Sequence, residues 1–220
     1  MRLNRAAGRR FRRFIRVYAS TDFGPRFAGA PCPGIRSKST IHSFVFFVSR
    51  LAPILEKLAR AQSRMLGTAD EVPSDQWRTR PEDGGWSAAE IIAHLIMVER
   101  SVVGKADRVL QHPPRKFSRL QKLHFPLALV EARLVRRKAP MPVDPEMIGE
   151  KETMLAELRE IRERLLAFID ETKERNLGVY RWRHPFLGSL STYEWFEMVA
   201  RHELRHVKQM REIAGSYRKP

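Results

Sequence analysis

Three histidines lie within apolar stretches whose spacing is helical. His202 and His206 are four residues apart, so on a helix they lie on one face about one turn apart. His94 has a similar place in an earlier stretch, between Ile91 and Val98. An imidazole is costly to bury unless its polar nitrogens find partners, and one divalent metal ion could serve all three rings. The predicted metal ligands are therefore His94, His202 and His206. The alternative is that each ring bonds a backbone carbonyl or a hydroxyl and simply fills space.

The later pair of histidines also completes a known motif. With Glu203 between them, they read H-E-x-x-H, the zinc-protease motif in which the glutamate is the general base. Such a protease needs a third ligand downstream, but after His206 the chain has no histidine and only Glu212, on the same expected helix. His94 can supply the third ligand instead, and three protein ligands leave positions open, as in catalytic sites. The pattern argues against a protease and for a three-histidine site, with zinc expected and nickel, iron or cobalt as alternatives.

Glu203 is the candidate catalytic residue. It follows His202 directly, so on a helix it is turned about 100° away, and we expect it at the edge of the buried face. If the site activates water, Glu203 is the natural base. Its alternatives are a pair with an arginine of a neighbouring turn or helix, or a hydrogen bond to a ligand histidine. The remaining histidines, at positions 42, 112, 124 and 184, are expected in exposed loops or the N-terminal tail.

Four helices can position these residues. Apolar periodicity predicts them over about 46–66, 87–110, 150–173 and 191–215, and no stretch shows the alternation of a strand. Two of the four begin with the S-x-x-E pattern of a capping box, at Ser87 and Ser191. The long connection between the second and third helices allows these two to run parallel, and much of it could form an extra amphipathic helix. The sequence therefore predicts an all-α four-helix bundle with a long crossover.

The positive charge is concentrated in two segments. The net charge is +16; residues 1–45 contain ten Lys and Arg against one acid, and residues 115–138 contain eight against one. The rest of the chain is neutral, which is not the charge distribution of a nucleic-acid-binding fold, so no specific nucleic acid is expected. The segment 115–138 can contact an acidic substrate or anionic lipid, and attachment to a nucleic acid or a membrane through the basic segments is a minor alternative.

The composition also indicates the limits of the folded domain and the cellular compartment of the protein. Residues 1–45 are predicted to be a basic, disordered extension, a targeting segment or the product of an early start site, and residues 46–217 the helical domain. The single cysteine, Cys32, excludes an internal disulfide framework and favours a reducing, cytoplasmic location. No apolar run is long enough for a transmembrane segment.

Two stretches together resemble a known family. "GGWSAAEIIAHL" (84–95) and "RHPFLGSLSTYEWFEMVARHELRHVKQMREI" (183–213) are similar to the DinB/YfiT superfamily of metal-dependent four-helix enzymes. The resemblance implies a bundle with parallel middle helices, a metal site at His94, His202 and His206, and often a homodimer. Some relatives are thiol S-transferases that use bacillithiol or mycothiol, one is a thiol-dependent maleylpyruvate isomerase, and many have no known activity.

The expected function is thus a divalent-metal-dependent enzyme acting on a small molecule. It would be either a thiol S-transferase, with a low-molecular-weight thiol as co-substrate, or a small-molecule hydrolase. The alternative from another class is a non-catalytic, metal-stabilised helical binding module.

Overall fold

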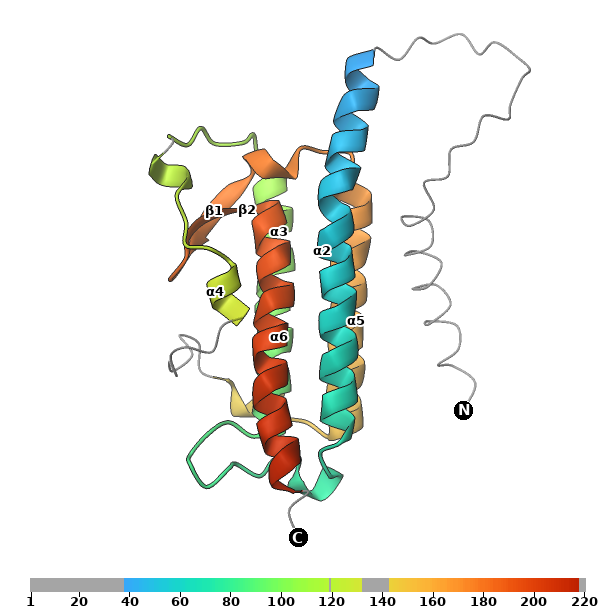
Figure 1. Cartoon of the computed structure of the whole chain (residues 1–220), viewed down its shortest axis with the longest axis vertical. Helices are drawn as coiled ribbons and strands as arrows, with labels where there is room; N and C mark the ends of the chain where they lie inside the picture. The colour runs from blue at the N-terminus through green and yellow to red at the C-terminus, as the bar shows by residue number, and fades with distance from the viewer. Residues whose placement is uncertain (1–37, 119, 132–142, 218–220) are drawn as a thin grey trace, which may run out of the picture.

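Four long helices form the body of the protein (Figure 1). The computed structural model describes residues 38–118, 120–131 and 143–217, and the side chains of the first helix from Arg50 onward. Helix α2 packs mainly along α6, and α3 packs along α5. The predicted all-α bundle is confirmed. The long helices are α2 (Lys38–Asp70), α3 (Ala88–Leu110), α5 (Lys151–Thr172) and α6 (Thr192–Ser216).

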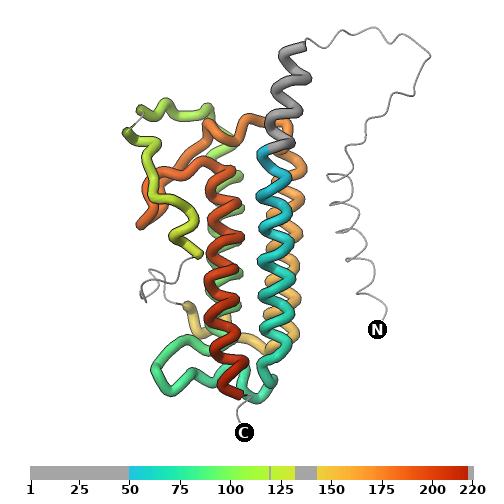
Figure 2. The backbone as a smooth tube through the Cα atoms, in the orientation of Figure 1, coloured from blue at the N-terminus to red at the C-terminus, as the bar shows by residue number. Residues whose placement is uncertain are grey.

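The chain direction follows the predicted topology. Helices α3 and α5 run parallel to each other, and α2 and α6 run the opposite way (Figures 1 and 2). The crossover between α3 and α5 therefore returns along the full length of the bundle. Its residues 132–142 lie outside the described part of the chain, as do residues 1–37 of the expected extension, including Cys32. The first helix starts at Lys38 and so includes the last residues of the segment predicted to be an extension.

Both predicted capping boxes are present, and they set where the two histidine-bearing helices begin. The Ser87 hydroxyl accepts from the Glu90 N–H at 3.2 Å, while the Glu90 carboxylate accepts from the Ser87 N–H at 2.9 Å. Ser191 and Glu194 repeat the arrangement at the start of α6, at 3.4 and 2.6 Å. Two of the donors that a helix start leaves unpaired are satisfied in each case.

A short hairpin that the sequence did not reveal precedes α6. Strands β1 (Arg181–His184) and β2 (Gly188–Ser191) pair antiparallel. Gly188 has a positive φ of 94°, and a Cβ there would lie 2.7 Å from the Leu123 carbonyl oxygen. Only glycine therefore lets the crossover lie so close to the hairpin.

The crossover itself differs from the expected amphipathic helix. Its described residues form only short turns of helix, and residues 132–138 of the basic segment lie outside the described part. Many of its apolar side chains face outward instead of forming one buried stripe. The short elements of the protein are η1 (Ser74–Gln76), η2 (Leu120–Lys122), α4 (Ala128–Glu131), η3 (Pro145–Met147) and η4 (Leu177–Val179).

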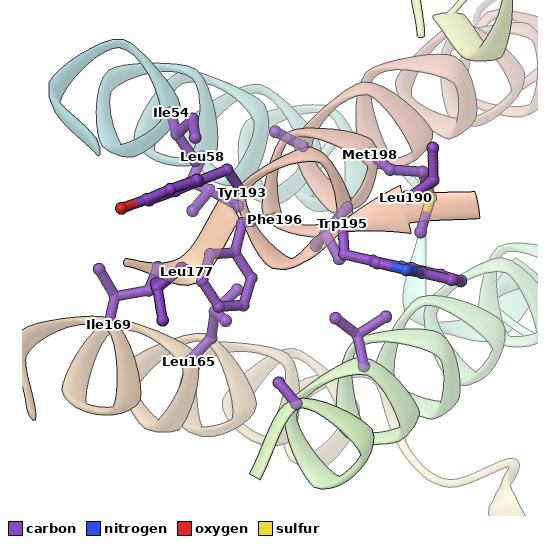
Figure 3. Close-up of a cluster of buried hydrophobic side chains, with 14 of the residues drawn as sticks. Ile54, Leu58, Leu165, Ile169, Leu177, Leu190, Tyr193, Trp195, Phe196 and Met198 are labelled. Carbon is purple, nitrogen blue, oxygen red and sulfur yellow. The ribbon is translucent and has the colours of Figure 1, made fainter. Parts of the chain in front are cut away.

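The core consists of two apolar clusters stacked along the bundle. In the cluster next to the hairpin, Leu58 of α2 and Leu165 of α5 surround Phe196 of α6 (Figure 3). The second cluster, at the other end, is built around Trp77 and Ile92. Their extent indicates that apolar burial is the main source of stability.

A charged triad lies where the two clusters meet. The Arg162 guanidinium of α5 donates to both carboxylate oxygens of Glu99 on α3, at 2.6 and 2.9 Å, and to Glu203 on α6 at 2.9 Å. It also donates to the Leu58 carbonyl of α2 at 2.8 Å. All three charged side chains are at most 3% exposed, so this one cation joins all four helices inside the core.

None of the helices in the described residues is both long enough and apolar enough to cross a membrane.

Arg162→Met should lower the free energy of unfolding by about 3–5 kcal/mol, because it leaves two buried carboxylates without their cation. Arg164→Met is the matched control, since Arg164 is two residues along the same helix but exposed, and within the described part of the chain its ion pair is with the exposed Glu160. The control should cost about 0.5 kcal/mol or less. Urea unfolding of both variants checks the difference, and equal losses would show that the triad adds nothing to stability.

Candidate metal centre

The three predicted ligand histidines meet between α3 and α6. The His202 Nε2 atom lies 3.3 Å from Nε2 of His94 and 3.2 Å from Nε2 of His206, and the three nitrogens are within 4.8 Å of one another. Two nitrogens bound to one tetrahedral zinc ion at 2.0–2.1 Å are separated by about 3.3 Å. Two of the three pairs of ring nitrogens are therefore already spaced as two ligands of a single ion would be.

Two of the three rings are held in the neutral form that a metal requires. Burial lowers the pKa of His94 to about 4. The pKa of His202 also lies well below its ordinary value, first because its imidazole is desolvated and then because His206 and His94 stand beside it. A neutral imidazole keeps one nitrogen lone pair, which is the form that coordinates a cation.

One hydrogen bond sets the tautomer of His206. Its Nδ1 atom lies 3.0 Å from the Gln209 Oε1 atom, so Nδ1–H donates and Nε2 keeps its lone pair. The Nε2 atom of His202 faces two other ring nitrogens, and a single N–H cannot donate to both. A shared cation satisfies these converging lone pairs better than hydrogen bonds between the rings do. The donor set therefore fits a divalent ion.

Trp86 forms a wall of this cluster. Its ring is parallel to that of His206, with centroids 6.1 Å apart, and tilted against that of His94 at 4.9 Å. Trp86 directly precedes the Ser87 N-cap of the helix that carries His94, and this position was the signal in the sequence that it could lie beside that histidine. Trp86 keeps partial exposure, so the site borders the surface on this side.

Glu203 does not join the histidines. Its side chain is 1% exposed and its Oε2 atom accepts from Arg162 at 2.9 Å, which is the alternative of a pair with an arginine on a neighbouring helix. Burial raises the pKa of Glu203 to about 7, although the charge of Arg162 opposes the shift. Its second oxygen has no hydrogen-bond partner among the described residues.

Two of the remaining histidines form contacts within the fold instead of being exposed in loops. His184, at the end of β1, accepts from the N–H groups of Phe186 and Leu187 through Nδ1, at 3.1 and 3.2 Å, and lies against the Trp195 ring. His184 also contributes to the lowered pKa of His202. His124 lies 3.0 Å from the Glu194 carboxylate. Only His112 is a fully exposed loop residue, as expected; the side chain of His42 lies outside the described part.

Comparison with known proteins agrees with this arrangement. The profile of the DinB superfamily matches residues 57–210, which span all four helices of the bundle and the three histidines. The chain belongs to the DinB superfamily. Uncharacterized protein YuaE of Bacillus subtilis (strain 168) is 28% identical over 153 residues, which cover 69% of this chain and 88% of that protein. No solved structure matches the chain. Family membership and the three-histidine cluster are together compatible with a metal-binding enzyme.

His94→Ala should weaken zinc binding by more than about 10²-fold. Mutation of a residue that only hydrogen-bonds to a metal ligand already lowers metal affinity 10–100-fold, and loss of a ligand itself should cost more. His112→Ala, which removes an exposed histidine just beyond the same helix, should bind zinc like the parent protein. Elemental analysis and competition with a chromogenic chelator measure the effect, and circular dichroism verifies the fold. Equal metal content in the two variants would exclude His94 as a ligand.

Proposed function

We propose that this DinB protein is a divalent-metal-dependent enzyme, with His94, His202 and His206 as the ligands and zinc as the ion. The observation that supports the proposal best is the convergence of three ring nitrogens, with the His202 Nε2 atom 3.3 Å from that of His94 and 3.2 Å from that of His206. When bound, the ion would lower the pKa of a coordinated thiol or water and so supply a nucleophile near neutral pH. The chain itself holds the three rings, fixes the His206 tautomer through Gln209, and shields one side of the site with Trp86.

Between the two expected reactions, the surroundings favour thiol transfer. A hydrolase needs a base beside the attacking water, and no carboxylate of the described residues belongs to the histidine cluster. Glu203, the candidate base, is bonded to Arg162 in the core. A thiol that ionises on a metal needs no such base. We therefore propose a thiol S-transferase that joins a low-molecular-weight thiol to a small electrophile, in keeping with the resemblance to thiol-using relatives.

The site borders solvent, which favours an enzyme over a non-catalytic binding module. A metal that only stabilises a bundle needs a closed set of ligands, usually four from the protein. Here three histidines form the cluster within the described residues, and both His202 and Trp86 keep partial exposure. A small molecule can approach from that side.

The transferase proposal predicts direct thiol binding at the loaded site. Cobalt-loaded protein should gain a thiolate-to-cobalt absorption band when bacillithiol, mycothiol or cysteine is added, and His94→Ala should not. The thiol that produces this band should then be joined to a chromogenic aryl halide by the zinc-loaded protein. A loaded protein that shows neither the band nor the conjugate with any of these thiols would contradict the proposal.

Glu203→Gln decides whether Glu203 is a base. The amide oxygen of glutamine can still accept from Arg162, so metal content should persist, and under the transferase proposal turnover should change by less than about threefold because no protein base is used. Glu99→Gln is the matched control, since Glu99 bonds the same guanidinium but is not adjacent to a ligand histidine. A selective loss of about 10²–10⁴-fold in Glu203→Gln, with metal retained, would instead establish Glu203 as a general base.

A further inference from the structure

Large apolar side chains are exposed on one flank of the bundle. Among the described residues, Leu120 is 79% exposed, Leu123 68% and Phe125 62%. Leu129 and Phe186 are each 47% exposed. All five come from the crossover and the hairpin, which lie together on the side of α6 away from α2 and α5 (Figure 1). We call this surface the crossover flank.

Backbone contacts join the crossover and the hairpin into one surface. The Phe125 N–H donates to the Leu187 carbonyl at 2.9 Å, and His124 forms an isolated bridge with Gly188. Arg181 donates to the Lys122 carbonyl at 3.3 Å. Leu123, Phe125 and Phe186 are therefore held side by side, although about sixty residues separate the two segments in sequence.

The crossover flank is also basic. Arg115, Lys116 and Lys122 of the crossover and Arg183 of the hairpin are exposed around the apolar residues. Residues 111–130 contain no acid. The first acid after them, Glu131, accepts a hydrogen bond from Arg201. A surface on which exposed leucine and phenylalanine lie on the same segments as exposed lysine and arginine is typical of proteins that bind at the interface of an anionic membrane.

The positive charge and the exposed apolar residues of the crossover flank distinguish between the partners that could cover it. A second copy related by a two-fold axis would place this basic flank against the same basic residues of its partner. A nucleic acid would neutralise the basic residues but would leave the leucines in water. An anionic lipid surface satisfies both, because its headgroups meet the cations and its acyl region takes up the apolar side chains.

We propose that the crossover flank docks this protein on an anionic membrane surface. Leu120, Leu123, Phe125 and Phe186 enter the interface, while Arg115, Lys116, Lys122 and Arg183 meet the headgroups. The bundle itself stays outside the bilayer. None of these residues belongs to the histidine cluster, so the proposal does not depend on the reaction.

The test is sedimentation of the full-length protein with lipid vesicles. It should bind vesicles of phosphatidylglycerol and phosphatidylcholine, bind pure phosphatidylcholine much more weakly, and lose binding in high salt. Combining Leu123→Ser with Phe125→Ser should weaken binding more than about tenfold, because two apolar side chains no longer enter the interface. Val179→Ser removes an exposed apolar residue outside the flank and should change binding little.

Two variants with the same change in net charge distinguish the effect of the crossover flank on binding from the effect of the overall charge. Lys122→Glu removes one cation from the flank and adds one anion, so binding to anionic vesicles should fall about 20- to 30-fold, at about fivefold per charge. Arg164→Glu makes the same change in net charge on α5 and should have little effect.

Three results would overturn the proposal. One is the absence of binding to anionic vesicles. Another is full binding by the flank variants, which would place attachment elsewhere in the chain, such as in its arginine-rich first 45 residues. The third is dissociation of a dimer into monomers by the flank variants in sedimentation velocity, which would make the flank a contact between copies.

Discussion

The buried guanidinium of Arg162 is the interaction on which the rest of the bundle depends. Apolar packing alone tolerates small slides between helices, but a cation in the core is satisfied only where its partners meet it. Arg162 finds them on each of the other three long helices: Leu58, Glu99 and Glu203. A shift of any of these helices by one turn, about 5.4 Å, would break its hydrogen bond to Arg162. Buried charges often add less stability than specificity, and fixing the register is the role this geometry supports.

That register brings the three histidines of the candidate metal site together. Glu99 lies five residues after His94 on α3, and Glu203 directly follows His202 on α6, so the contacts that hold the triad also place the His202 ring nitrogen 3.3 Å from that of His94. A metal site works only when its ligands are held to within about half an ångström, which helices do better than loops. Ring orientation needs further support. Gln209 supplies it for His206 through a hydrogen bond, and Trp86 packs against both His94 and His206.

Local sequence patterns predicted the features of the structure that depend on local interactions. The helix spans and the starts at Ser87 and Ser191 follow from apolar periodicity and capping, and the spacing of the histidines indicated the ligand cluster. The hairpin was missed because its four-residue strands show no alternation and depend on the crossover packed against Gly188. Arg162 was missed because a charged residue on a helix is assumed to face solvent. Its position four residues after Leu158 and three before Leu165, within the apolar stripe, was the signal.

The same reasoning explains why the glutamate of H-E-x-x-H lies away from the histidine cluster here. A protease places its glutamate beside the ion because the helix carrying both histidines presents that side to the substrate. In this bundle the third histidine comes from α3, so α6 turns the His202 face toward α3. A residue one position later is rotated by about 100°, and that rotation carries Glu203 into the core toward α5. The ion pair with Arg162 then gives the glutamate a structural role in the core. The reactive group in our proposal must accordingly come from a small molecule, which is why thiol binding discriminates between the functions that this fold allows.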